Sequence, residues 1–310
     1  MRRQSVWMWA VCLSLSLTAC HRHESVASPL APVAKQAKRM SAADIKQSQQ
    51  QAERAKPQTH PLTKVSKLWV EGNMRILVQE GGSKSEIVAL NPNTKKSKDV
   101  HLKLHNGILL LDRHLKTPMR TFVLRTNALR SIKVKRGAQV IFLSDHKRPL
   151  GIKMRDGGTV QFQRGAKIKH LTVEGSGHSK VFGPVPESMG LNIKKIAYQA
   201  GKGSRLVVNY IKGVDLNVVA GGAGDVSLYG LVANLTANLR DKVTLNAKAL
   251  PVGRAYITAV DKSTANVWPL ASLQARAYGA AQIAYFHRPK HLTRYAERSG
   301  AILDETTTVG

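Results

Sequence analysis

From Leu129 onward the chain repeats a short pattern with a period near 20 residues. Each unit opens with two apolar residues around one polar residue, passes a turn built on Gly or Asp, and adds a second short apolar run. The units open at Ile132-Lys-Val134, Ile152-Lys-Met154, Leu171-Thr-Val173, Leu191-Asn-Ile193, Leu216-Asn-Val218, Leu235-Thr-Ala237, Ile257-Thr-Ala259 and Leu273-Gln-Ala275. So short a unit buries its apolar face only by stacking on its neighbours. The repeat therefore predicts an all-β fold, a parallel β-solenoid with two short strands in each coil, over residues 129–286.

The segments on either side of these coils have different patterns. Residues 65–128 alternate apolar and polar residues in short runs, and Asn106-Gly107 is a strong hairpin signal. Because an exposed strand edge recruits other chains, we expect these N-terminal strands to cover one end of the stack. Residues 287–310 leave the repeat, and the sequence leaves open whether this tail caps the last coil or hangs loose.

Residues 20–64 lack the large apolar side chains that a core needs. The segment is rich in Ala, Gln, Ser, Lys and Pro, a composition typical of a flexible tether. We therefore expect one solenoid domain over residues 65–286, held at a distance from whatever precedes it.

The first twenty residues have the pattern of an export signal. Arg2 and Arg3 precede an apolar run that is too short to span a bilayer comfortably, and Leu17-Thr-Ala-Cys20 follows. This tetrapeptide resembles the lipobox of bacterial lipoproteins, which implies cleavage of residues 1–19, acylation (palmitate among the chains) of Cys20, and anchoring without spanning. His21 after the cysteine implies the outer membrane. An ordinary cleaved signal with a chance cysteine is the alternative.

Charge and cysteine content narrow the function further. Removing residues 1–19 takes away Arg2, Arg3 and Cys12, so 46 Lys and Arg face 19 Asp and Glu, a net charge of +27, and Cys20 is the only cysteine left. Such a charge predicts anionic partners, such as lipopolysaccharide, acidic glycans or anionic lipid, but does not choose among them. Nucleic acid is disfavoured by export and by the scarcity of aromatic residues, which make up 5% of the chain.

Several segments of residues 65–286 resemble the auto-transporter adhesin head domain called GIN. The resemblance rests on Gly107-Ile-Leu-Leu110, Thr121-Phe-Val-Leu124, Leu129-Arg-Ser-Ile132 and the turn in Val173-Glu-Gly-Ser-Gly177. The Gly-Ile-Asn signature of the family reads Gly190-Leu191-Asn192 here. The resemblance implies a β-solenoid on the cell envelope and carries over no catalytic residue.

The first two coils align at a step of 20 residues, which places Lys133 beside Lys153 and Lys135 beside Arg155 on the outward side. Lys167 and Lys169 precede the next strand. Like charges on adjacent strands cost stability unless counter-charges or solvent relieve them, and Asp156 and Glu174 are candidates for that relief. These six cations are the candidate polyanion-binding residues, while a merely solvated surface is the alternative.

Metal and catalytic sites find less support in the sequence. His101 with His105 and His287 with His291 form pairs, but no trio with a carboxylate is recognisable, so we expect no metal and no cofactor. A polysaccharide lyase or hydrolase needs several carboxylates on one outward column. The acids of the coils are instead scattered among turns, at Asp156, Glu174, Glu187, Asp215, Asp225, Asp241 and Asp261.

Three functions remain open at this point. The first is a non-enzymatic envelope lipoprotein whose basic solenoid binds anionic polymers or acts as an adhesin. The second is a structural spacer or assembly module without a ligand of its own. The third, least supported, is an enzyme acting on acidic polysaccharides.

Overall fold

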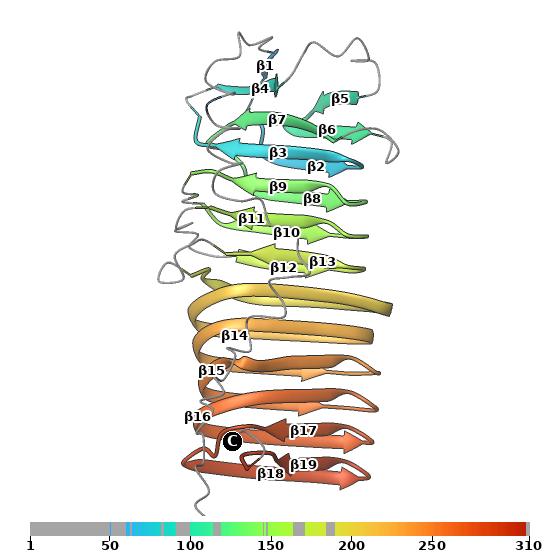
Figure 1. The fold of residues 1–310 in the computed structure, drawn as a ribbon, viewed down its shortest axis with the longest axis vertical. Coiled ribbons are helices and arrows are strands. Elements are labelled where there is room, and N and C mark those ends of the chain that lie inside the picture. Colours follow the sequence, from blue (N-terminus) through green and yellow to red (C-terminus); the bar gives the residue numbers. More distant parts are fainter. Residues whose placement is uncertain are drawn as a thin grey trace, which may run out of the picture. The chain divides into compact units, whose positions relative to one another are not determined.

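The computed structural model describes residue 50 and residues 60–307, except 63, 82–83, 91–99, 114–118, 145, 147, 164–170 and 184–189. The predicted signal peptide, Cys20 and nearly all of the predicted tether therefore lie outside the described residues. Within these residues, no helix is long and apolar enough to cross a bilayer. The fold is the predicted one, an all-β parallel solenoid (Figure 1).

Nineteen strands are present in the described part of the chain. They are β1 (His60–Leu62), β2 (Lys67–Glu71), β3 (Met74–Gln79), β4 (Ser85–Leu90), β5 (Val100–His105), β6 (Ile108–Arg113), β7 (Arg120–Arg125), β8 (Ser131–Lys135), β9 (Gln139–Phe142), β10 (Leu150–Met154), β11 (Thr159–Phe162), β12 (Leu171–Gly175), β13 (Ser179–Phe182), β14 (Ile193–Leu239), β15 (Thr244–Ala259), β16 (Thr264–Gly279), β17 (Gln282–Tyr285), β18 (His291–Arg298) and β19 (Ala301–Asp304).

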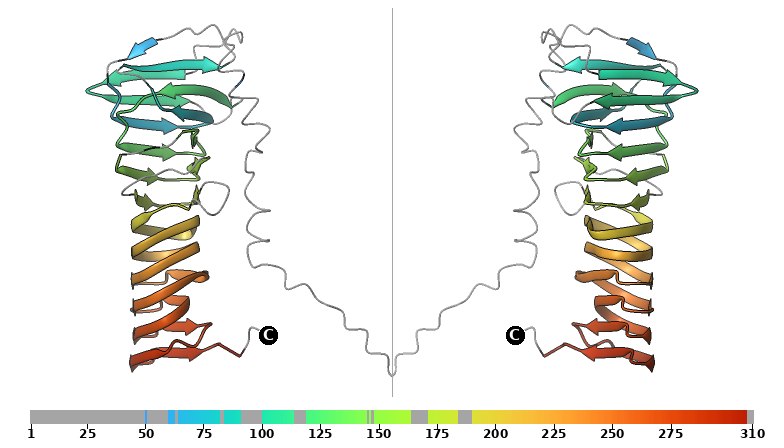
Figure 2. Two further views of the ribbon diagram at one scale, coloured as in Figure 1. Left: turned by 90° about the vertical axis from the view of Figure 1, so that its left-hand side faces the viewer. Right: turned by 90° about the vertical axis from the view of Figure 1, so that its right-hand side faces the viewer.

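Each coil contributes one strand to each of two parallel stacks. The first stack contains β6, β2, β8, β10 and β12, and the second contains β7, β3, β9, β11 and β13. The long strands β14, β15 and β16 bend and pair in both stacks, and β17, β18 and β19 complete the series (Figure 2).

The order of the coils in space differs from their order in the sequence. β2 and β3 lie between the later coil β6–β7 and the coil β8–β9, pairing in parallel with both (Figure 1). β4 and β5 then pair antiparallel with β7 and β6. The N-terminal strands therefore supply a regular coil as well as an antiparallel cover for this end of the stack.

The register of the first stack places like residues above one another in the core. Ile132 pairs with Ile152, and Ile152 with Val173, and all are fully buried. One unit differs from the sequence interpretation: Val173 pairs with Ile196, while Leu191 bridges to Ile211. The stacked strand of this coil therefore begins at Ile193, which pairs with Leu171, and a bulge at the next position shifts the register by one residue.

Two apolar clusters stabilise the coils. The larger is the continuous interior, where the rings of Phe142 and Phe162 stack with centroids 4.8 Å apart. The smaller lies on the second stack near its N-terminal end and contains Leu77, Val88, Leu90, Val123, Ile141 and Leu143. Leu77, Val123 and Ile141 are in register on neighbouring strands, so this cluster forms one band across β7, β3 and β9.

The tight turns between the two strands of a coil lie along one edge. Asp156, Asp241 and Asp261 each take a left-handed backbone conformation there, with φ of 53°, 65° and 64°. The Asp241 carboxylate accepts a hydrogen bond from the Gly222 amide at 2.8 Å, one coil away. These aspartates therefore have a structural role, since Asp tolerates this conformation and its carboxylate can accept a backbone hydrogen bond.

Residues beyond 286 continue the coils. β18 and β19 pair in parallel with β16 and β17, and Arg294 and Asp304 occupy positions in register with buried Ala275 and Tyr285. The Tyr285 hydroxyl donates to Asp304 at 2.7 Å and accepts a hydrogen bond from Arg294. Hydrogen bonds from Thr306 and Tyr285 lower the pKa of Asp304 to about 2. The last coil thus places charged side chains where other coils carry apolar ones.

Inward-pointing charges are one way in which proteins protect an open strand edge. We expect the double substitution Arg294→Leu and Asp304→Leu to make this end adhesive, so that the purified protein forms larger species in sedimentation velocity. The control is Arg276→Leu with Glu297→Leu, which removes the same charge types from outward positions. Unchanged sedimentation of the Arg294–Asp304 variant would contradict this role.

Candidate anion-binding face

The structure brings the four predicted cations of the first coils together. Lys133 on β8 is in register with Lys153 on β10. Lys135 ends β8, and the amide of Arg155 donates to the carbonyl of Val134 at 2.9 Å, which places Arg155 beside Lys135. All four side chains alternate with buried residues and therefore face outward. Lys167 and Lys169 lie outside the described residues.

Two glutamates provide the counter-charges. Glu71 on β2 lies 3.7 Å from Lys135 and 3.0 Å from Arg136, and Glu174 on β12 lies 2.8 Å from Lys153. Glu174 is the relief predicted from the sequence, whereas Asp156 is held in its turn. The Lys153–Glu174 pair is largely exposed, and such pairs contribute only about 0–1 kcal/mol. It can open at little cost when an anion arrives.

Trp69 is a functional candidate that the sequence interpretation missed. The residue is 37% exposed, and the ammonium of Lys133 lies 4.5 Å from the centroid of its ring. Trp69 precedes Lys133 by more than sixty residues and meets it only because β2 inserts beside β8. We call Trp69, Lys133, Lys135, Lys153 and Arg155 the cationic face.

Lys133 shows that positive charge accumulates on this face. Burial lowers the pKa of Lys133, and the neighbouring charges of Lys135, Arg155 and Lys153 lower it further, with Glu71 acting in the opposite direction. Unfavourable interactions among like charges are the condition that a bound anion relieves.

A hollow adjoins the cationic face where the first-stack strands begin. Ser131, Gly151 and Thr172 are in register there, and a β-carbon added at Gly151 would meet nothing closer than 3.8 Å. The hollow has a volume of about 510 Å³ and is lined by Arg130, Arg148, Pro149, Leu150, Gly151 and Thr172. Two arginines therefore extend the positive surface around the edge of the stack.

The remaining acids of the described coils do not form a catalytic column. Asp215 accepts a hydrogen bond from the Asn234 amide at 2.8 Å. Asp225, which the sequence interpretation placed in a turn, lies in β14 and pairs with Arg205 at 3.1 Å. Over the described residues, no three His, Cys, Asp or Glu side chains come together as a metal site would require.

Stacked coils with a buried apolar interior and charged side chains at outward strand positions define a parallel β-solenoid. Residues 65–289 match the family described as "Putative auto-transporter adhesin, head GIN domain". The chain belongs to this family, as the resemblance of its motifs predicted. No curated protein matches it in sequence.

Solved structures show the same fold at low sequence identity. A "putative adhesin" from Parabacteroides merdae has a TM-score of 0.52 at 16% identity, over 81% of this chain and 97% of its own. From Parabacteroides distasonis, a "Putative lipid binding protein" has a TM-score of 0.50 at 12% identity, over 81% of this chain and 98% of its own. A "putative adhesin" from the same species has a TM-score of 0.51 at 12% identity, over 79% and 95%.

The family and these structures are described by adhesion or lipid binding and not by a reaction. Membership therefore supports an adhesin-like role at the cell envelope or outside the cell. These descriptions do not name the particular molecule that is bound.

Proposed function

We propose that the cationic face binds an acidic polysaccharide of the cell envelope or its surroundings, without catalysis. The observation that carries this proposal is the juxtaposition of exposed Trp69 with the in-register pair Lys133 and Lys153. Cations pair with carboxylate or sulfate groups, and an exposed indole offers a flat surface to a sugar ring. Neighbouring strands lie about 4.8 Å apart, so the face is a regular ladder along which a polymer can lie.

The anchor belongs to the same proposal. Acylation of Cys20 and a tether over residues 20–64 would hold the domain near the outer membrane, whose lipopolysaccharide is itself an anionic polymer. The support is the lipobox sequence and the strongly basic composition. Mass spectrometry of the mature N-terminus tests this part, and an unmodified Cys20 would overturn it.

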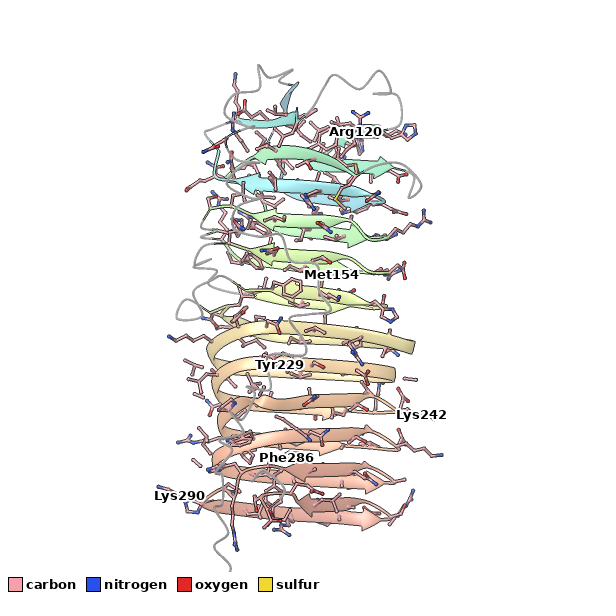
Figure 3. The ribbon with its side chains drawn as sticks, viewed as in Figure 1. Arg120, Met154, Tyr229, Lys242, Phe286 and Lys290 are labelled. Atoms are coloured by element: carbon pink, nitrogen blue, oxygen red, sulfur yellow. The ribbon has the colours of Figure 1, made fainter. Side chains whose placement is uncertain are left out.

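We expect the triple substitution of Lys133, Lys153 and Arg155 by Gln to lower markedly the salt concentration that elutes the protein from immobilised heparin. The reason is that exposed charge pairs weaken as salt screens them, and fewer pairs need less salt. The control replaces Arg240, Lys242 and Lys262 by Gln and so removes the same net charge; Lys242 lies on the tight-turn edge (Figure 3). Equal elution of the two variants would mean that heparin is retained by net charge alone and not by the cationic face. That result would favour a structural spacer without a ligand of its own.

Trp69→Ala separates sugar recognition from simple ion exchange. This variant keeps every cation, so its elution from a sulfonate exchanger should not change, while its retention on heparin should fall. Formation of unsaturated products from acidic glycans in the presence of calcium would instead support a lyase.

A further inference from the structure

A second cavity lies next to the hollow, and residues from the ends of β3 and β9 line it. These two strands end at the same edge of the stack (Figure 1). The volume of the cavity is about 230 Å³, below the roughly 300–1,000 Å³ of pockets for drug-sized ligands, which limits it to about one sugar ring. The described lining residues are Val78, Gln79, Glu80, Thr126, Asn127, Phe142, Ser144, His146 and Arg148. Arg148 lines both hollows, so the cavity is connected to the cationic side of the stack.

His146 marks this cavity as more than a packing defect. The side chain is only 7% exposed, and its Nε2 atom is buried without a hydrogen-bond partner among the described residues. The ring packs edge-on against Phe142, with centroids 5.6 Å apart. A buried polar atom without a partner costs about 1–3 kcal/mol, so a ligand or water that satisfies Nε2 is favoured.

The protonation state of His146 defines what that ligand must offer. Burial lowers the pKa of His146, and Arg148 lowers it further, while Leu129 and Glu80 act in the opposite direction. The ring is therefore neutral at neutral pH. In a neutral imidazole one nitrogen donates and the other accepts. The Leu129 backbone raises the pKa of the ring, which is the effect of a carbonyl that accepts a hydrogen bond from the ring. Nε2 is then the accepting nitrogen and needs a hydroxyl or amide donor.

The other lining groups select a sugar over a simple anion. A sulfate group or a phosphodiester would satisfy Arg148 but carries no proton to donate to Nε2 at neutral pH. Arg148 is half-buried and has no ion-pair partner among the described residues. Glu80 and Asn127 add acceptors and a donor suited to hydroxyl groups, and apolar atoms of Val78 and Phe142 complete the wall.

We propose that this cavity binds one uronic-acid-type sugar ring of the polymer that lies along the cationic face, with Arg148 on the carboxylate and a ring hydroxyl donating to His146 Nε2. The inference rests on the proposed function, because it supplies the identity of the acidic sugar. It also divides the binding region into two parts with different roles. Charge attracts the polymer along β8 and β10, and the cavity selects a particular unit at the edge.

The test measures trigalacturonic acid binding to the purified soluble domain by calorimetry, with neutral maltotriose as a comparison. His146→Phe keeps the ring contact with Phe142 but removes the acceptor, and we expect about a tenfold loss of affinity for trigalacturonate. Arg148→Gln should cause a similar loss. The control is His291→Phe, at an exposed position on β18, which should bind like the unmodified protein.

The outcomes separate this inference from the proposed function. Unchanged trigalacturonate binding in both His146→Phe and Arg148→Gln, equal binding of maltotriose, or no binding to the unmodified protein would each overturn the cavity assignment. Heparin retention reports on the cationic face and should be nearly unaffected by His146→Phe. If the Lys133–Lys153–Arg155 variant and its control eluted equally from heparin while trigalacturonate still bound, the proposed function of the cationic face would be wrong. The assignment of the cavity as a sugar site would still hold.

Discussion

Replacing Phe162 by Ala is expected to lower the free energy of unfolding of the solenoid by about 3–5 kcal/mol. Phe162 is 1% exposed, and its ring stacks on Phe142 at 4.8 Å with only 14° between the ring planes. The two rings belong to β9 and β11, which pair directly in parallel. Removing one ring leaves a cavity between successive coils that the regular ladder on either side cannot close.

Urea unfolding monitored by circular dichroism measures this loss, and hydrogen exchange locates it. Because each coil contacts mainly its neighbours, we expect amide protection to fall most in β9, β11 and β13. Tyr256→Ala is a suitable control, since it removes an aromatic ring that is 45% exposed and points away from the core. A Phe162→Ala protein as stable as the control would show that this stack does not hold the coils together.

Replacing Gly230 by Ala is expected to cost more than about 3 kcal/mol, the upper end of the usual range for backbone strain. Gly230 has a φ of 142°, a conformation that L side chains rarely adopt, and a β-carbon there would lie 2.0 Å from the carbonyl oxygen of Ile211. Ile211 belongs to the preceding coil. The contact is therefore between the backbones of two coils, and relief requires them to separate.

Gly201→Ala is the matched control for this substitution. A β-carbon at Gly201 meets nothing within 4 Å, and its φ is not positive. Soluble yield and thermal unfolding should therefore be near normal for Gly201→Ala and severely reduced for Gly230→Ala. Similar behaviour of the two variants would mean that the coils can move apart at this position without penalty.

Together these contacts explain how the protein can present so much positive charge. The apolar interior and the backbone ladder stabilise the stack, so outward positions such as Lys133 and Lys153 need not contribute to folding. Glu71 relieves part of the repulsion at a half-buried pair with Lys135, and Glu174 does so at an exposed pair with Lys153. Folding therefore depends on the interior, and the outward side chains are available for binding. Both proposals depend on this separation.

The repeat made the fold predictable from sequence. Apolar residues alternate with polar ones, as in Ile132 with Val134 and Ile152 with Met154. In units of this length they can be buried only when the units stack, and their equal spacing sets the register between strands. That register also predicted Lys133 beside Lys153, because outward residues follow inward ones in a strand.

The partners of these residues were decided by tertiary structure. Trp69 and Glu71 reach the cationic face because β2 and β3 insert between two coils that come later in the chain, and no local pattern encodes that order. The shift of the stacked strand from Leu191 to Ile193, and the bulge that follows Ile193, could not be predicted from the spacing of the repeat.

The sequence by itself thus determined the solenoid and the outward column of cations, which follow from periodicity, and its motifs indicated the family. Only the tertiary structure decided which groups flank that column and that His146 and Arg148 share a cavity. The physical reason is that a strand pattern specifies which side a residue faces, whereas the neighbours across coils depend on long-range pairing of whole strands.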